Sequence, residues 1–335
     1  MVPWVERPAL DINLDKPMAE RYAEMPREAL LAGKRLLAAV TDTIPRKARR
    51  LAPLVRLRTL NRFHAEIVSM ARQVNADWRD VMLANISYDL LIATFGCSTV
   101  ALATPSGPVV ARNMDWWPED ILAQASYLMQ FSRKGSPQFV NAGWPGASGV
   151  VTGLSHRGFA VVLNAVIATE GYSRIGYPVL LHLRRVLEDA DGFDSALKLL
   201  CEQRLMTSAL FTLVGAENHQ RVVVERTPTK CARRWPKGDG PLLTTNDYRL
   251  LFYPETHAGS EIYESTCSRY QALCEFFAGH RPDKDVDDNA LLYVLTDARV
   301  IQGITAQHII IRPRQKEIRL FVPRHLLGDA NGAPS

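Results

Sequence analysis

The sharpest change in the spacing of apolar residues along this chain falls at Gly96–Cys97. Before that point, residues 26–44 and 77–95 place apolar side chains three and four positions apart, which predicts amphipathic helices, and Asp77 is a suitable N-cap. The second helix has to stop by Gly96, because the following residues have the spacing of short strands separated by turns. A run of helices followed by runs of strands, without strict alternation, predicts a layered α+β fold.

The part of the chain after Cys97 is expected to begin with three hairpins. They are STVALAT with VVARN, ASYLMQFS with PQFVNAG, and GVVTGLS with FAVVLNAV. Helices are expected at 178–203 and 261–278, and further strands at SALFTLVGA, QRVVVERT, AQHIIIRP and KEIRLFVP. The acidic run DKDVDD (283–288) lacks the glycine and the final glutamate of a calcium loop, so we expect it to cap a helix.

Composition limits the class of protein. The 335 residues, 47% hydrophobic and 22% charged, are ordinary for a soluble globular enzyme with one large core or two modest ones. The five cysteines have no metal-ligand spacing, and their odd number excludes a complete disulfide framework, so a reducing compartment is expected. The first 22 residues lack the apolar core of a signal peptide, and we expect a cytoplasmic protein. There is no P-loop, GxGxxG or HExxH motif, so neither a cofactor nor a metal is expected.

Positive charge is concentrated in residues 46–63. Seven Arg or Lys residues alternate there with Leu, Val and Phe, which indicates a basic amphipathic surface. Such a surface can make peripheral contact with an anionic membrane, or it can be a solvated helix face. No nucleic-acid-binding motif accompanies the basic run, so we expect no DNA or RNA partner.

The first hairpin places several reactive side chains near one another. If Ser106 and Gly107 occupy its turn, the numbers of paired residues sum to about 213. Asp115 then lies opposite the start of the strand that carries Cys97, and Arg112 lies one step nearer the turn. A thiol, a carboxylate and a guanidinium are therefore brought together, either as a reactive site or as a buried Asp–Arg pair that joins two strands.

The segment GCSTVALATPSGPVVARNMDW resembles the start of the catalytic subunit in the acid ceramidase and N-acylethanolamine-hydrolysing acid amidase group. That group belongs to the choloylglycine-hydrolase branch of the N-terminal-nucleophile (Ntn) hydrolases. Ser98 replaces the usual Thr, and Ala111 stands where Gly is common. Four further segments are similar in the same order: INLDKPMAERY (12–22), GLSHRGFAVVLNAV (153–166), LLTTNDYR (242–249) and STCSRYQAL (265–273).

The resemblance implies a set of catalytic roles. Cys97 becomes the nucleophile, and its own α-amino group, with a pKa near about 8, becomes the base. Asp115 holds that amine, while Arg112 favours the thiolate and orients the scissile group. Asn164 and Asn246 supply oxyanion donors, and Arg269 is a further active-site arginine. Trp116 and Trp117, directly after Asp115, are expected to line a substrate pocket, although core packing explains either of them equally well.

The resemblance also implies a fold and a maturation step. The fold is an Ntn-hydrolase αββα sandwich preceded by a helical N-terminal segment. Cleavage between Gly96 and Cys97 frees the amine and leaves a heterodimer of residues 1–96, the helical segment, and residues 97–335, the catalytic domain. The implied substrate is a small-molecule or lipid N-acyl amide.

Two other functions remain open at this point. The segments RNMDW, VVVERTP and SRYQAL also resemble isopenicillin-N acyltransferase-like peptidases, which pass the acyl group to an amine instead of water. An uncleaved, non-catalytic lipid- or partner-binding protein is the second alternative. A glycine before Cys97 favours the enzyme, because an unhindered carbonyl suits attack by the thiol.

Overall fold

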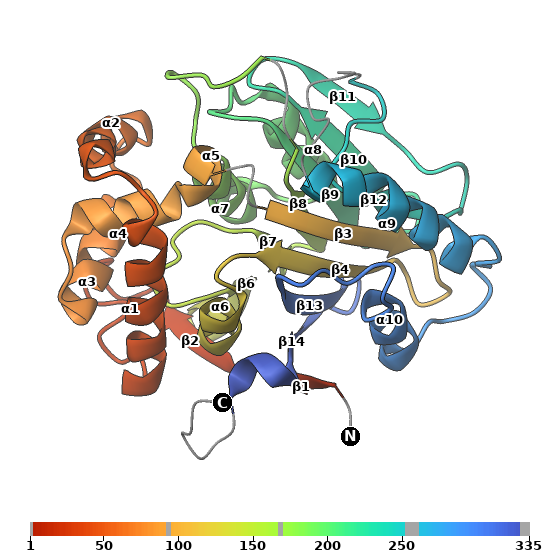
Figure 1. Ribbon diagram of the computed structural model, residues 1–335, viewed down its shortest axis with the longest axis horizontal. Helices are drawn as coiled ribbons and strands as arrows, with labels where there is room; N and C mark the ends of the chain where they lie inside the picture. The colour runs from red at the N-terminus through yellow and green to blue at the C-terminus, as the bar shows by residue number, and fades with distance from the viewer. Residues whose placement is uncertain (1–2, 92–94, 167–169, 252–260, 329–335) are drawn as a thin grey trace.

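Two antiparallel-rich sheets form the centre of the molecule in the computed structural model, which describes residues 3–91, 95–166, 170–251 and 261–328 (Figure 1). The six-stranded sheet has the order β1-β14-β13-β4-β3-β12, and the eight-stranded sheet has the order β11-β10-β9-β8-β7-β6-β5-β2. Strands of the smaller sheet are β1 (Trp4–Glu6), β3 (Phe95–Leu102), β4 (Val109–Trp116), β12 (Leu242–Thr244), β13 (Thr305–Arg312) and β14 (Glu317–Pro323). Strands of the larger sheet are β2 (Ala9–Asn13), β5 (Tyr127–Arg133), β6 (Ser136–Gly143), β7 (Thr152–Ser155), β8 (Phe159–Asn164), β9 (Ala209–Gly215), β10 (Arg221–Arg226) and β11 (Cys231–Arg234).

The two sheets pack face to face through one apolar layer. Side chains alternate between the faces of a strand, so every second residue of the central strands points into this layer. Val110 and Ile309 come from the smaller sheet, and Val162 and Leu210 come from the larger one. All four are buried, and the layer they share fixes how β3 and β4 face the larger sheet.

Helices cover the outer face of each sheet. α9 (Glu261–Phe277) and α10 (Asp288–Leu295) cover the smaller sheet, where Leu273 and Leu292 pack against Val100 and Ala111. α7 (Val179–Asp189) and α8 (Phe193–Glu202) cover the larger sheet (Figure 1). The predicted αββα sandwich is confirmed.

The N-terminal helices gather at one end of the sandwich, on the left of Figure 1. They are α1 (Arg27–Asp42), the 3-10 helix η1 (Arg46–Arg50), α2 (Leu51–Arg58), α3 (His64–Val74), α4 (Trp78–Asn85) and α5 (Ser87–Leu91), with α6 (Glu119–Ala125) beside them. The first residues depart from the helical prediction: β1 pairs with β14, and β2 adds to β5 in parallel. These two short strands lie at sheet edges, where tertiary pairing decides the structure of a segment too short to show a clear period. The N-terminal segment therefore contributes to both sheets.

The helix expected over 77–95 is two shorter helices. Asp77 caps α4 as predicted, accepting a hydrogen bond from the backbone N–H of Arg79 at 2.9 Å. α4 ends at Asn85, α5 ends at Leu91, and residues 92–94 of the expected helix lie outside the described residues. Gly96 does not terminate a helix, because β3 already begins at Phe95.

Most elements after β3 lie where the sequence predicts them. The region 178–203 is the helix pair α7 and α8, and Asp287 in the acidic run 283–288 caps α10 through the N–H of Ala290 at 2.9 Å. The prediction missed α6, β11, β12 and the extent of α10, which are short elements. A 3-10 helix η3 (Arg324–Leu327) follows β14. Within the described residues, no helix is both long enough and apolar enough to cross a bilayer.

Candidate active site

The β3–β4 hairpin has a register that differs by two from the predicted one. Gly96 pairs with Asp115, Cys97 with Met114 and Thr99 with Arg112, so paired numbers sum to 211 instead of 213. The reason is the turn, which has Pro105 and Ser106 at its centre and is closed by a 3.0 Å hydrogen bond from the N–H of Gly107 to the carbonyl of Thr104. Proline has the fixed φ suited to the first central position, and Gly107, with φ of 103°, is the last residue of the turn.

This register decides which side chains share a face. Cys97 and Arg112 point into the layer between the sheets, together with Val110. Asp115 points to the opposite face, toward α9, beside the backbone of Gly96. The thiol and the guanidinium therefore meet directly, whereas the carboxylate approaches Gly96 from the other side of the strand.

Arg112 holds the thiol of Cys97. Its Nη2 donates to Cys97 Sγ at 2.7 Å, its Nη1 donates to Thr152 Oγ1 at 2.6 Å, and its Nε donates to the carbonyl of Asn113 at 3.2 Å. All three donor nitrogens are used, and the side chain is fully buried, so the guanidinium has a fixed position. Burial raises the pKa of the Cys97 thiol, and the positive charge of Arg112 opposes that rise.

Asp115 presents one free oxygen toward Gly96, the residue before Cys97. Its Oδ1 accepts from Thr305 Oγ1 at 2.6 Å, and its Oδ2 has no hydrogen-bond partner among the described residues. A Cβ added at Gly96 would lie 3.0 Å from that Oδ2, so the carboxylate lies against Gly96 itself. Burial raises the pKa of Asp115, while Arg269, Thr305 and Arg112 act in the opposite direction.

Asn246 and Arg269 hold the backbone of Cys97. Asn246 Oδ1 accepts from the backbone N–H of Cys97 at 3.0 Å and from Arg269 Nη2 at 2.7 Å. Arg269 Nη1 donates to the carbonyl of Cys97 at 2.7 Å and to Ser98 Oγ at 3.0 Å. The nitrogen that would become the free amine therefore already points at a side-chain acceptor. Burial lowers the pKa of Arg269, and the charges of Asp115 and Cys97 act against that shift.

Both predicted oxyanion donors use one amide N–H in this structure. Asn164 Nδ2 donates to the carbonyl of Thr244 at 3.2 Å, and Asn246 Nδ2 donates to the carbonyl of Ala165 at 2.8 Å. Asn164 Oδ1 accepts from Thr99 Oγ1 at 2.8 Å, which fixes the orientation of the amide. A carboxamide nitrogen has two N–H groups, so each residue keeps one for a further acceptor.

The two tryptophans after Asp115 have different surroundings. Trp116 is buried and stands edge-on to Trp144 with ring centroids 5.2 Å apart, in the wall of a narrow apolar cavity shared with α1, α3 and α4. Trp117 lies past the end of β4, is 48% exposed and does not line this cavity. The structure therefore places Trp116, but not Trp117, in the wall of this cavity.

Sequence reasoning missed the hydroxyl groups that orient these side chains. Thr99 fixes Asn164, Thr152 fixes Arg112, and Thr305 fixes Asp115. Thr266 Oγ1 accepts from the backbone N–H of Asn246 at 2.8 Å and so helps to position Asn246. A signal was available, because a threonine inside an apolar buried strand such as GVVTGLS needs a polar partner.

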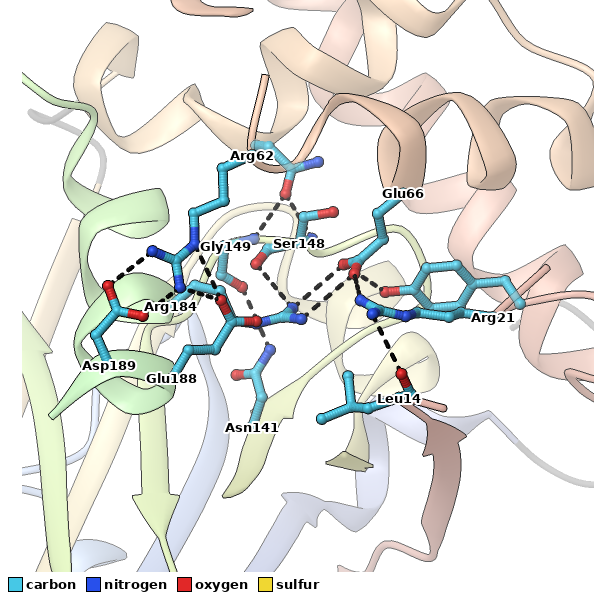
Figure 2. A network of polar contacts seen from close by, with 12 residues as sticks. Leu14, Arg21, Arg62, Glu66, Asn141, Ser148, Gly149, Arg184, Glu188 and Asp189 are labelled. Atoms are coloured by element: carbon cyan, nitrogen blue, oxygen red, sulfur yellow. Dashed lines mark hydrogen bonds and ion pairs between the residues drawn. The ribbon is translucent and has the colours of Figure 1, made fainter. Parts of the chain in front are cut away.

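A buried ion-pair network attaches the N-terminal helices to the sandwich (Figure 2). Glu66 of α3 accepts from Arg184 of α7 through Nη1 and Nη2 at 3.2 and 3.3 Å, from Arg21 Nη1 at 3.1 Å and from Tyr22 Oη at 3.0 Å. Arg184 also donates to Glu188 Oε1 at 2.7 Å. Glu66 would lie in one fragment and Arg184 in the other if the chain were cut before Cys97.

The same helices hold the loop that leads to Thr152. Asn85 Oδ1 accepts from the N–H groups of Ser148 and Gly149 at 2.7 and 2.9 Å, and its Nδ2 donates to the carbonyl of Gly146 at 2.9 Å. Arg184 Nη1 donates to the carbonyl of Ser148 at 3.3 Å. The position of β7, and with it the contact between Thr152 and Arg112, therefore depends on the N-terminal helices.

The basic segment 46–63 exposes leucines on one side. Leu54, Leu57 and Leu60 are 62%, 71% and 84% exposed. They line a groove of about 700 Å³ together with Tyr172 and Met206. The basic residues of the segment are partly engaged: Arg49 pairs with Asp80 at 2.5 Å, and Arg62 pairs with Glu188 at 2.7 Å. Among the described residues, no group of three or more His, Cys, Asp or Glu side chains is arranged to hold a metal.

Comparison with known proteins agrees with the geometry of the candidate site. The family model "Acyl-coenzyme A:6-aminopenicillanic acid acyl-transferase" matches residues 102–288, more than half of the chain. That range includes five of the six proposed catalytic residues, and Cys97 lies five residues before it.

Individual relatives have low sequence identity to the chain, but their alignments cover most of it. The chain is 23% identical over 325 residues to N-acylethanolamine-hydrolyzing acid amidase of Caenorhabditis elegans, covering 90% of this chain and 88% of the relative. It is 27% identical over 230 residues to acyl-coenzyme A:6-aminopenicillanic-acid-acyltransferase of Emericella nidulans, covering 67% of this chain and 62% of the relative. The solved structure of a Caenorhabditis elegans ortholog of the acid amidase superposes with a TM-score of 0.55 and 19% identity, over 65% of this chain and 93% of that one. The predicted resemblance, fold and enzyme class are confirmed.

Proposed function

Because the chain belongs to the acyl-coenzyme A:6-aminopenicillanic acid acyl-transferase family, we propose that it is a self-processing enzyme that hydrolyses the linear amide bond of N-acyl compounds, with Cys97 as nucleophile. The observation that carries the proposal is the 2.7 Å contact between Arg112 Nη2 and Cys97 Sγ. Burial raises the pKa of this thiol, and the guanidinium charge opposes that rise, so Arg112 favours the thiolate, which is the attacking form. A thiol with a purely structural role does not need such a partner.

Self-processing comes first in this proposal. The Cys97 thiol attacks the carbonyl carbon of Gly96, the peptide bond between them breaks, and the thiol proton ends on the Cys97 nitrogen. Water then opens the resulting thioester and leaves the carboxyl group of Gly96. The absence of a Cβ at residue 96 supports this step, because a side chain there would press on Asp115.

The amine released at Cys97 then serves as the base. An α-amino group has a pKa near about 8, so an appreciable fraction is neutral at working pH and can take the thiol proton. Asn246 Oδ1, which accepts the Cys97 N–H in the uncut chain, is placed to orient the amine. The free Oδ2 of Asp115 next to Gly96 supplies a negative charge for its ammonium form.

Amide hydrolysis uses the same thiol. The thiolate attacks the substrate carbonyl, and the second N–H groups of Asn164 and Asn246 stabilise the oxyanion, each such donor being worth about 100- to 1,000-fold in rate. The Cys97 ammonium gives its proton to the leaving amine. Water then attacks the S-acyl enzyme, releasing the carboxylic acid and restoring the thiol. Arg269 acts by holding Asn246 and the Cys97 carbonyl, so it is a positioning residue.

We propose lipid N-acyl amides as the substrate class. The groove beside Leu54, Leu57 and Leu60 has the volume and apolar lining of a small-ligand pocket, and we assign the acyl chain to it. Basic residues next to exposed leucines are suited to peripheral contact with an anionic membrane surface, from which such a substrate could be drawn. Leu57→Glu should reduce co-sedimentation with phosphatidylserine-containing vesicles, and unchanged binding would contradict the membrane contact.

The first test of the proposed function is the intact mass of the purified protein under denaturing conditions. Two fragments that meet at Gly96/Cys97, absent in Cys97→Ala and present in Cys267→Ala, support self-processing. A chain that stays whole at mildly acidic and neutral pH leaves Cys97 without its amine and overturns the mechanism. Turnover of N-acylethanolamines and ceramides by the cleaved protein then tests the substrate class.

The family match also favours a second function, transfer of the acyl group to an amine. Adding a 6-aminopenicillanic-acid-like amine to the cleaved enzyme distinguishes the two reactions. Formation of a new amide at the expense of free acid indicates a transferase. Unchanged release of free acid indicates a hydrolase.

A further inference from the structure

Two cysteines outside the proposed active site lie together at the outer end of the larger sheet. Cys201 is near the C-terminus of α8, and Cys231 is the first residue of β11, the edge strand. Both are free thiols, one partly buried and one exposed. The proposed reaction at Cys97 uses neither of them.

Arg226 brings the two cysteines into proximity. It is paired with Cys231 in the β10–β11 register. Its guanidinium reaches α8 on both sides of Cys201, donating from Nη1 to the carbonyl of Leu200 and from Nη2 to that of Gln203 at 2.6 Å. The end of the helix is thereby fixed beside the start of the edge strand.

Cys201 and Cys231 lie where α8 packs against β11. Cys231 and Arg233 are two residues apart on β11 and point to the same face, and both interact with the Cys201 side chain. These contacts, that of Cys231 first and that of Arg233 next, lower the pKa of Cys201, while the shared hydrogen bond raises the pKa of Cys231. The charge of Arg226 also favours the Cys201 thiolate. The pKa of Cys201 is thus lowered and that of Cys231 is raised, as expected for an attacking thiol beside a resolving one.

We propose that Cys201 and Cys231 are a reversible thiol–disulfide pair that is oxidised by small-molecule disulfides. The Cys201 thiolate attacks one sulfur of the oxidant, whose S–S bond breaks and releases one thiolate. Cys231 then loses its proton to solvent and attacks the Cys201 sulfur of the mixed disulfide, releasing the second thiolate. The protein loses two electrons and two protons, and the small disulfide is reduced to two thiols.

The cross-link would join α8 to the unprotected edge of the larger sheet. The loop that it closes contains β9 and β10, so it restrains a segment that the unfolded chain leaves free. It also covers a position where an exposed edge strand is prone to pair with another chain. In a reducing compartment such pairs are transient and respond to the redox state.

Oxidised glutathione is the probe for the test. The full-length protein is incubated with it near pH 6.5, and peptide mapping without reduction follows the thiols over time. We expect the Cys201 and Cys231 peptides to become linked, with loss of the mass of two hydrogen atoms, and the link to disappear with dithiothreitol. In Cys231→Ser the reaction should stop at one glutathionyl group on Cys201. Cys267, exposed on α9, is the internal control, and we expect it to react about tenfold more slowly than Cys201.

The outcomes are decisive in both directions. Linked peptides in the wild-type protein together with the trapped adduct in Cys231→Ser support the pair. Failure to form the link, or glutathionylation of Cys267 as fast as that of Cys201, overturns it. The readout is mass and does not depend on Cys97 chemistry, so the proposed enzyme activity and this pair can fail separately.

Discussion

The buried network at Glu66 allows a prediction with a definite magnitude. Glu66→Gln removes the negative charge that faces Arg21 and Arg184 together, while keeping the size of the side chain. Glu66 and Arg184 are 1% and 0% exposed, so water cannot replace the lost partner. Arg184 keeps its 2.7 Å contact with Glu188, which limits the damage.

Removing one partner of a buried ion pair typically costs about 3–5 kcal/mol. Because Arg184 retains one carboxylate, we expect the lower end, a fall of about 3 kcal/mol in the free energy of unfolding, or roughly 150-fold in the equilibrium constant. Replacing both residues, as in Glu66→Gln with Arg184→Met, removes the buried Arg184 charge that Glu66→Gln alone leaves without its partner, and only Arg21 then loses its carboxylate. The double variant should therefore lose about 2 kcal/mol less than the sum of the two single variants.

The pH dependence of this effect has a definite sign. Burial by itself raises the pKa of Glu66, but Arg184, Arg21 and the hydrogen bond from Tyr22 together hold the pKa below its ordinary value of 4.5. A carboxyl with a lowered pKa contributes stability that is present above its ordinary pKa and is lost as the pH falls through the folded-state pKa. The difference between wild type and Glu66→Gln should therefore be constant at neutral pH and shrink below about pH 4.5.

Urea unfolding followed by tryptophan fluorescence measures these differences, in a Cys97→Ala background, where the proposed self-cleavage cannot occur. The control is Glu275→Gln, whose ion pair with Arg299 is about half exposed and should be worth less than about 1 kcal/mol. A loss below about 1 kcal/mol for Glu66→Gln, or strict additivity in the double variant, would refute the argument that this pair is coupled through burial.

Three further predictions concern the site and its surroundings. Thr152→Val removes the hydroxyl that fixes Arg112, and turnover should fall about tenfold. The acidic limb of the pH–rate profile should move to higher pH. An acidic limb that does not move contradicts a positioning role for Thr152. Gly96→Ala would place a methyl group 3.0 Å from Asp115 Oδ2 and should slow self-cleavage, followed as a time course by mass spectrometry. The control is Gly192→Ala, whose added Cβ has no atom within 4 Å, and it should cleave as the wild type does. Burial raises the pKa of Asp89, so its contribution to stability is present below the ordinary carboxyl pKa and is lost as the pH rises through the folded-state pKa. Asp89→Asn should abolish that loss in thermal unfolding measured from pH 4 to 8. Identical pH profiles for the variant and the wild type would count against this role of Asp89.

The sequence predicted the fold because periodicity and turn residues act locally. The hairpins β5–β6 and β7–β8, the helix pair α7–α8 and the cap at Asp287 all lie where the pattern places them. The prediction failed where a segment is short and paired at a distance, as with β1 and β2. Such edge strands gain their structure from β14 and β5, which lie more than 100 residues away along the chain.

The candidate site shows the same division. The sequence alone determined that Cys97, Arg112 and Asp115 share one hairpin, because the residue types and the turn are local features. Only the tertiary structure decided that Arg112 touches the thiol while Asp115 faces Gly96 from the other side, since a two-residue change in register follows from which residue occupies the turn. It also decided that Asn246 and Arg269, about 150 and 170 residues away in sequence, hold the Cys97 backbone. The physical reason is that hydrogen bonds across a packed core depend on how the layers meet, and no local pattern encodes that distance.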